Sequence, residues 1–554
     1  MIFNRMILAA LLGLSTAEAR KTSNLRKLQG NSDRKMKAPC TLVLRLEQFE
    51  DHSDAYEWDC ELDPSDGAGV VSFPDTKFKK DEFESGASTL FGDVTIDKNG
   101  KATIKGNPVF GRREKNNNSR NLAVLGDRSV LAIRVVGLDI ATTASETVIS
   151  EEIFGTTGAD QFNLKTGYTQ CSNGDLNFLP TPDEPARSIT NGVYTVFLNE
   201  NISGLTNSEL QTKVVNQATA DLGTLNTQFD HVMLCLPPIA GFGGIAYAYV
   251  NWYLSVYKDA WCNYPSAQLH EIGHNIGLAH SNEGTTTYAD QTGMMGYSYS
   301  SDEGPRQCFN NAKNWQLGWY ADRRATATPL TASWDGDLVG FAEVNSIPAT
   351  SDQVILLKVE GDDVDYYVGF NRKVGINSGT QEGGNQVTIQ SRPLGTGYAE
   401  SILVAKLSAG GTYVISDFAG ELVTIEVLSI NTASVPGVAS VRVYKDSEPT
   451  KAPTQSPTKP PTQSPTKSPT QAPTQSPTKS PTKSPSPTES PTKSPTKAPT
   501  QAPTQSPTQA PTQSPTESPT KSSSPTKAPT KSPTQSPTQS PTSSPTKAPT
   551  VGPN

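Results

Sequence analysis

Histidine is scarce in this sequence, with five His among 554 residues. Its six cysteines include no CxxC pair, which argues against a zinc ribbon built from cysteines. After the N-terminal segment, no apolar run approaches the roughly 20 residues that a membrane-spanning helix needs. A cysteine-based zinc ribbon and a membrane span are therefore not expected.

Acidic residues outnumber basic ones in most of the chain. The formal net charge is −8, but the residues from Pro449 onward hold 11 Lys against 2 Glu, so the preceding residues carry about −17. An acidic body of this kind argues against nucleic acid as the main partner.

Residues 1–19 have the features of a secretory signal peptide. A positive charge at Arg5 precedes an apolar run, and small residues follow at a cleavage position, Ala17-Glu18-Ala19. We therefore expect a secreted protein, extracellular or associated with a cell wall. Residues 20–38 are basic and polar without an apolar period, which predicts a flexible processed segment.

The remaining cysteines and two sequons fit an exported chain. An even number of cysteines predicts up to three disulfides, and two Asn-x-Ser sequons predict N-glycosylation at Asn117 and Asn201. The disulfide candidates are Cys40, Cys60, Cys171, Cys235, Cys262 and Cys308.

Hydrophobic patterning predicts three folded parts. Short apolar alternations indicate a β-rich N-terminal module over residues 39–120, ending in a charged polar loop that suits a boundary or a processing site. A similar pattern predicts a β-sandwich-like C-terminal module over residues 326–446. Between them, residues 121–325 predict an α/β domain, in which strands at 129–136 and 231–236 flank a helix. That helix begins at Thr206 with a capping-box pattern.

The chemistry is concentrated in residues 270–280, HEIGHNIGLAH, which hold three of the five histidines. His270 and His274 are four residues apart, so a helix places both imidazoles on one face, where they can bind one Zn²⁺. Gly277 can adopt a positive φ and end the helix, so that His280 approaches as a third ligand. Three His ligands leave a fourth position open for water, as a catalytic zinc requires.

Glu271 directly follows the first histidine and suits a general base for a water on the metal. The alternatives are ordinary core histidines and a site that has lost catalysis. The whole pattern would arise by chance in such a chain on the order of once in a million, and every specified position is intact.

The motif resembles that of the metzincin metalloproteases. Met295, in the sequence Gly293-Met294-Met295-Gly296-Tyr297, matches the turn methionine that lies beneath the zinc in that group. The resemblance to the astacin-like and serralysin-like branches implies that Tyr297 reaches the metal or donates to the oxyanion. The alternative for Tyr297 is a packed aromatic side chain in a turn.

The sequence motifs HEIGHNIGLAHS, MMGYS and CFNNAKNWQLGWY are similar to those of the gametolysin family of algal and protist metalloproteases. The resemblance implies a metzincin-like endopeptidase with one catalytic zinc, acting on matrix or cell-wall glycoproteins. The PRCGxPD-like string of matrix metalloprotease prodomains is missing, which argues against latency through a thiol on zinc. Pairing of Cys40 with Cys60 is the simpler expectation.

Two further stretches have open interpretations. Residues 241–248 predict an edge strand that pairs with an extended peptide, or alternatively a Gly-rich surface loop. Residues 447–554 form a Pro/Thr/Ser repeat that predicts a disordered, extended tail. Its lysines suit binding to an anionic wall polymer or silica, although it would serve equally as an inert spacer.

The function predicted from the sequence is a secreted zinc endopeptidase. The alternative function is that of a catalytically inactive cell-wall or adhesion protein, in which the Pro/Thr stalk is the functional region.

Overall fold

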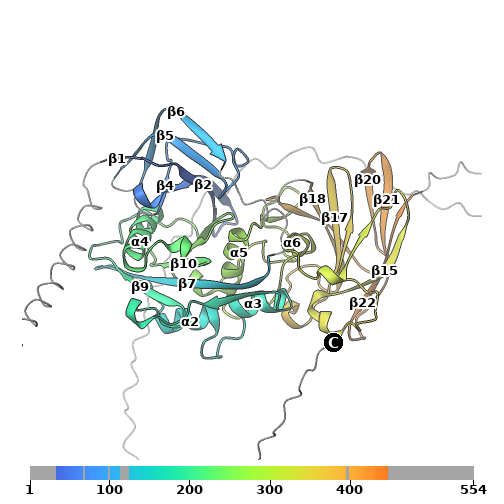
Figure 1. The fold of residues 1–554 in the computed structure, drawn as a ribbon. Coiled ribbons are helices and arrows are strands. Elements are labelled where there is room, and N and C mark those ends of the chain that lie inside the picture. The colour runs from blue at the N-terminus through green and yellow to red at the C-terminus, as the bar shows by residue number, and fades with distance from the viewer. Residues whose placement is uncertain (1–32, 67–68, 98–99, 113–123, 395–397, 447–554) are drawn as a thin grey trace, which may run out of the picture. The chain divides into compact units, whose positions relative to one another are not determined.

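The computed structural model describes residues 33–66, 69–97, 100–112, 124–394 and 398–446 (Figure 1). They form a mixed structure that is rich in strands and has few helices, which agrees with the coarse part of the fold prediction. The expected signal peptide, the sequon at Asn117 and the repeat tail lie outside these residues. The second sequon asparagine, Asn201, is exposed.

Five parallel strands form the centre of the largest sheet. They are β7 (Gly126–Val136), β8 (Leu176–Pro180), β9 (Val193–Phe197), β10 (His231–Leu236) and β12 (Leu254–Lys258). One further strand, β11 (Ala246–Tyr249), runs antiparallel beside β12. Every residue of β10 is buried, as expected for a strand whose two faces are both covered.

Helices cover both faces of these strands. Alternate residues of β10 enter different cores: Met233 packs with α2 (Glu146–Phe154), α3 (Leu164–Cys171) and α5 (Pro265–Asn275), whereas Leu234 packs with α4 (Asn207–Leu222). This division follows from the two-residue period of a strand. The histidine-bearing helix α5 therefore lies on the same face as α2 and α3.

The helix predicted from Thr206 is confirmed as α4. The Thr206 side chain accepts a hydrogen bond from the backbone N–H of Glu209, and the Glu209 carboxylate accepts one from the N–H of Thr206. Leu210, Val214 and Ala218 form its buried stripe.

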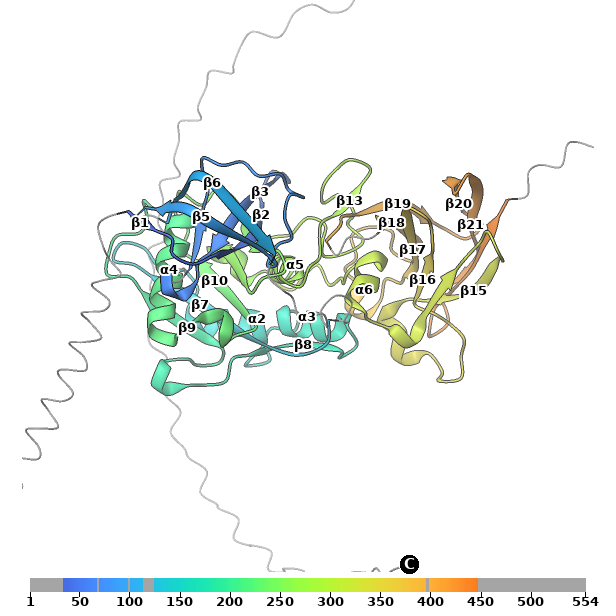
Figure 2. The same ribbon diagram turned by 45° about the horizontal axis from the view of Figure 1, so that its top comes forward.

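The N-terminal module contributes six strands, gathered beside α4 in both views (Figures 1 and 2). They are β1 (Arg34–Lys35), β2 (Cys40–Gln48), β3 (Asp54–Glu61), β4 (Val70–Ser72), β5 (Ser88–Ile96) and β6 (Ala102–Arg112). These strands enclose a core of their own that includes Leu42, Leu44 and Trp58. Their sheet is continuous with the central strands because β2 pairs antiparallel with β11. The assignment of residues 39–120 to a separate N-terminal module remains a prediction.

The end of the predicted flexible segment includes a short strand. Within residues 20–38, Arg34 and Lys35 form β1 and pair with Ile96 and Thr95 of β5. Backbone pairing requires no apolar side chains, so the polar sequence gave no signal of this strand.

The C-terminal module consists of two sheets that share one core. The six-stranded sheet contains β13 (Ser281–Glu283), β14 (Arg324–Ala327), β16 (Leu356–Val359), β17 (Val364–Asn371), β18 (Gln386–Pro393) and β19 (Ser401–Leu407). The four-stranded sheet contains β15 (Trp334–Val339), β20 (Thr412–Phe418), β21 (Glu421–Asn431) and β22 (Val438–Lys445). Val368 and Ile389 of the first sheet pack with Ile425 and Val441 of the second. A short helix, α6 (Asn311–Leu317), packs on β17 and β18.

All six cysteines are paired, as Cys40–Cys60, Cys171–Cys308 and Cys235–Cys262. The first pair joins β2 to β3 inside the N-terminal module, and the other two lie within residues 171–308. Among the described residues, no helix combines the length and the apolar character that crossing a bilayer would require.

A buried carboxylate joins the N-terminal module to the central domain and makes their contact sensitive to pH. Glu61 accepts hydrogen bonds from Trp252 Nε1, Asn226 Nδ2 and the Tyr253 hydroxyl, at 2.6, 3.0 and 3.4 Å. Burial outweighs these bonds and raises the Glu61 pKa to about 7. The folded state therefore favours the protonated form.

We predict that Glu61→Gln removes a pH-dependent part of the stability. With a raised folded-state pKa, the contribution of Glu61 is fully present below its unfolded pKa and is lost as pH rises through about 7. The free energy of unfolding of the wild type, relative to the variant, should fall by roughly 3 kcal/mol between pH 4 and pH 8. Denaturant titrations across this range measure it, with the exposed Glu82→Gln as the control. A difference that does not change with pH would contradict the prediction.

Candidate metal centre

Helix α5 places His270 and His274 one turn apart on the same face. It begins at Pro265, where a proline is well suited to the first helical turn because the N–H it lacks would have no intrahelical partner. Every residue of α5 is buried. The Gln268 side chain donates to the carbonyls of Glu152 and Cys262, both at 2.9 Å, and so fixes the helix against its surroundings.

The chain turns sharply after α5 at Gly277. This residue has φ +93°, a conformation that other residues rarely adopt. A Cβ atom built at Gly277 would also lie 2.5 Å from Oδ1 of Asn251. Both observations explain why a glycine stands here, and the turn brings His280 back to the two helical histidines.

The three imidazoles converge through their Nε2 atoms. Nε2 of His274 lies 3.1 Å from Nε2 of His270 and 3.1 Å from Nε2 of His280. Nδ1 of His270 faces the carbonyl oxygen of Met294 at 2.9 Å, and Nδ1 of His274 faces that of Leu278 at 2.8 Å. A carbonyl only accepts hydrogen bonds, so the Nδ1 atoms of His270 and His274 carry the protons. When both imidazoles are neutral, each Nε2 atom therefore has no proton and presents a lone pair.

Two bare lone pairs at this distance repel each other unless a cation lies between them. Nitrogens bound to tetrahedral zinc at about 2.1 Å are separated by roughly 3.4 Å, close to the spacing found here. Burial lowers the pKa of His270 to about 4 and the pKa of His274 and His280 well below the usual value, which favours the neutral form that binds metal. His270, His274 and His280 therefore fit a metal ion.

Glu271 lies beside this cluster and is itself buried, with an exposed fraction of 1%. Its Oε2 atom has no hydrogen-bond partner. Burial raises the Glu271 pKa well above its usual value, and the nearby Glu47 adds to the effect. A carboxylate held in this way needs a cation or a proton close by.

The turn that contains Met295 packs directly beneath α5. Gly273 lies between the two helical histidines, and a Cβ atom there would come within 2.5 Å of the Met295 sulfur. The carbonyl of Met295 accepts a hydrogen bond from the N–H of Ser281 at 2.8 Å, next to His280. The turn therefore contacts the helical pair and the residue after the third histidine.

Residues 129–371 match the family model described as gametolysin peptidase M11. This part of the chain belongs to the gametolysin peptidase family. The match covers the histidine cluster, Glu271 and the Met295 turn, and the family is one of peptidases. No curated protein and no solved structure gives a significant match to the chain.

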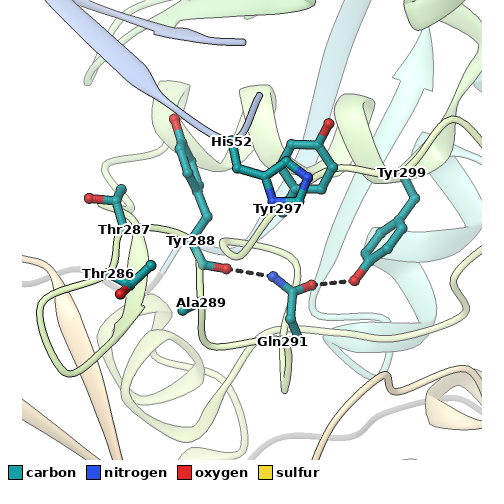
Figure 3. Close-up of a pocket in the computed structure, with 8 residues that line it drawn as sticks. All are labelled: His52, Thr286, Thr287, Tyr288, Ala289, Gln291, Tyr297 and Tyr299. Carbon is teal, nitrogen blue, oxygen red and sulfur yellow. Dashed lines mark hydrogen bonds between the residues drawn. The ribbon is translucent and has the colours of Figure 1, made fainter. Parts of the chain in front are cut away.

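In this gametolysin-family domain, Tyr297 points toward the N-terminal module. Its ring stacks on that of His52 with centroids 3.6 Å apart (Figure 3). Its hydroxyl donates to the carbonyl of Glu50 at 3.3 Å. The predicted role of Tyr297 as an oxyanion donor remains a prediction. In the present arrangement its hydroxyl is bonded elsewhere.

A second tyrosine, Tyr288, packs on the histidines and was not identified from the sequence. Its ring centroid lies 4.3 Å from that of His280 and 5.7 Å from that of His270. Its hydroxyl is buried without a hydrogen-bond partner. Tyr288 also lines a cavity of about 260 Å³, together with His52, Gln291, Tyr297 and Tyr299 (Figure 3). Sequence spacing could not predict the contact of Tyr288 with the histidines, because that contact depends on the path of the loop after β13.

The third histidine has a neighbour from the N-terminal module. Oδ2 of Asp54 lies 3.7 Å from Nδ1 of His280, which has no hydrogen-bond partner. Asp54 is separated from His280 by more than 200 residues, so sequence reasoning could not bring them together.

We predict that Gly273→Ala destabilises the domain by about 1–3 kcal/mol, because the new methyl group and the buried Met295 sulfur compete for one space. In the absence of a clash, alanine would stabilise a helix by about 1 kcal/mol relative to glycine, so the sign is diagnostic. Thermal unfolding measures the change, and the bound zinc per chain should fall with it.

The matched control is Gly204→Ala, because a Cβ atom at Gly204 meets nothing within 4 Å. Combining Gly273→Ala with Met295→Ala should cost less than the sum of the single changes. Additive losses would show that the two residues do not share the space.

Proposed function

We propose that this protein is a secreted zinc-dependent endopeptidase that hydrolyses peptide bonds of matrix or cell-wall glycoproteins. The observation that carries the proposal is the meeting of three imidazole Nε2 atoms next to Glu271, a buried residue whose Oε2 atom has no hydrogen-bond partner. Membership of a peptidase family supports the reaction class. The identity of the metal as zinc, the role of Glu271 as general base, the substrate and secretion go beyond the family match and are part of the proposal.

Three neutral imidazoles with room for a fourth ligand are the donor set of a catalytic zinc. His270, His274 and His280 would hold the ion. When bound, zinc polarises the scissile carbonyl and lowers the pKa of a coordinated water to about 7. The carbonyls of Met294 and Leu278 keep the protons of His270 and His274 on Nδ1 and so keep Nε2 available.

In the proposed reaction Glu271 moves the proton. Its carboxylate accepts a proton from the attacking water and passes it to the nitrogen of the leaving amine. Its position directly after His270 on α5 supports this role. Tyr297 remains the predicted donor to the oxyanion, and to act it must leave the carbonyl of Glu50.

We also propose that the catalytic domain is metzincin-like. The strand order β8-β7-β10-β12-β11, with β11 antiparallel at the end, supports this proposal. So do the histidine helix after β12 and the methionine turn beneath it.

Secretion and surface attachment are proposed for the whole chain. Three disulfides are compatible with an oxidising, extracellular location. The Lys-bearing repeat of residues 447–554 would hold the enzyme on an acidic wall polymer or on silica through many weak contacts.

The rival function is a wall or adhesion protein without activity. Its signature would be a purified chain that binds wall material but does not cleave casein or gelatin with zinc present. Cleavage that stops on chelation and returns with zinc would support the peptidase.

We predict that Glu271→Gln retains zinc and the fold but lowers peptide turnover about 10²- to 10⁴-fold, because an amide cannot accept the proton of the attacking water. Elemental analysis of bound zinc and turnover of a labelled casein peptide measure both parts. A wild-type rate in a zinc-loaded variant would refute the assignment of Glu271.

We predict a different outcome for His280→Ala, which should lose the metal. Two ligands from one helix bind Zn²⁺ poorly, so the zinc content and the activity should fall together. Full zinc occupancy in this variant would mean that another residue is the third ligand.

A further inference from the structure

Strand β11 has no free edge in this structure. On one side it pairs with β12, and on the other it pairs antiparallel with β2 of the N-terminal module. In this register Leu46 faces Ala248, and the carbonyls of Leu44 and Gln48 accept hydrogen bonds from Val250 and Ile245, both at 2.8 Å. The edge of the catalytic strands that was predicted to pair with an extended peptide is therefore already occupied by an extended segment of the same chain.

Side chains strengthen this pairing. The Arg45 guanidinium is buried, lies over the Tyr247 ring at 5.1 Å, and pairs with Asp59 of β3 at 3.5 Å. The Tyr249 hydroxyl donates to Asp59 at 2.9 Å. Oε1 of Glu47 accepts a hydrogen bond from the N–H of Gly244 at 3.2 Å. The two strands are thus joined by a buried polar network as well as by backbone hydrogen bonds.

The turn between β2 and β3 extends from this strand onto the metal centre. Within it His52 stacks on Tyr297 (Figure 3). The carbonyl of Glu50, in the same turn, accepts the hydrogen bond of the Tyr297 hydroxyl. Asp54, the first residue of β3, faces His280. A second contact lies nearby, where Lys80 of the module pairs with Glu400 at 2.7 Å and Glu400 also accepts a hydrogen bond from Asn282.

With these contacts in place the centre is closed. His270, His274, His280 and Glu271 are each at most 1% exposed. An extended substrate needs both a free strand edge and access to the reacting groups. Neither is present while the N-terminal module is docked.

The covalent arrangement would allow the module to leave. Its one disulfide, Cys40–Cys60, is internal, and the other two disulfides lie within residues 171–308. No disulfide therefore ties β1–β6 to the catalytic strands.

We propose that the N-terminal module, β1 to β6, is an intramolecular inhibitor that uses β2 as a substitute for the extended peptide substrate. Strand β2 occupies the substrate edge of β11, and the β2–β3 turn covers Tyr297 and the histidines. This inference rests on the proposed peptidase function. It assigns inhibition to strand pairing and a covering turn, with no cysteine on the metal.

The first experiment removes the module from the zinc-loaded full chain. A recognition sequence for a specific protease replaces residues 115–120, and an N-terminal tag captures the module after cutting. Turnover of a labelled casein peptide should rise at least about tenfold on removal, since activity scales with the fraction of open molecules. Full activity before the cut, or loss of activity in a still folded catalytic domain after removal, would overturn the proposal.

The second experiment leaves the chain intact and needs no cleavage. His52→Ala combined with Asp54→Asn weakens the covering turn and should raise turnover. The matched control, Lys35→Ala with Asp93→Asn, removes an exposed ion pair on the outer strands of the same module and should not. Equal turnover in the two double variants would count against the proposal, and this comparison decides alone if the catalytic domain unfolds without its module.

A readout without catalysis separates this inference from the proposed function. In the Glu271→Gln background, removal of the module should increase hydrogen exchange of the β11 amides and tighten binding of the labelled casein peptide, measured by anisotropy. Unchanged exchange and unchanged binding would refute inhibition by β2. Exposed β11 amides with no hydrolysis by any Glu271-containing form would instead refute the peptidase function.

Discussion

The site depends on one constraint, which is that three imidazole Nε2 atoms must face each other in the buried interior. Their mutual repulsion opposes folding, so the surroundings have to hold each ring in place. The carbonyls of Met294 and Leu278 fix the tautomers of His270 and His274. The turn at Gly277 sets the approach of His280, and the Met295 sulfur fills the space that Gly273 leaves open beneath α5. Together these features hold the three imidazoles in the arrangement that a cation site requires.

Much of this site could be predicted because its chemistry is local in sequence. Helical spacing places His270 and His274 on one face, and the need for a positive φ explains Gly277. The capping box at Thr206 was equally readable, since its two hydrogen bonds join residues three positions apart. Buried strands such as β10 could be recognised from an uninterrupted apolar run. The even cysteine count predicted the disulfides, although only Cys40–Cys60 could be proposed as a pair.

The remainder could not be predicted because it depends on contacts between distant segments. The pairing of β2 with β11 joins two strands of ordinary composition, and neither strand's sequence indicates with which strand it pairs. Asp54 and Tyr288 reach His280 through turns whose paths depend on tertiary packing. The sequence allows residues 241–248 to be either an edge strand or a Gly-rich loop. In the structure β11 begins within this stretch, at Ala246, and runs antiparallel to both of its neighbours.

The position of β13 has a consequence for where this protein can be divided. β13 begins at Ser281, immediately after the third histidine, and pairs with β19, whose Ser401 donates its backbone N–H to the carbonyl of His280 at 3.2 Å. The family match ends at residue 371, thirty residues before that strand. The matched segment is therefore shorter than the segment whose backbone contacts the third histidine. A fragment that ends at residue 371 would leave the carbonyl of His280 without this hydrogen bond, so a fragment made for expression has to extend through β19.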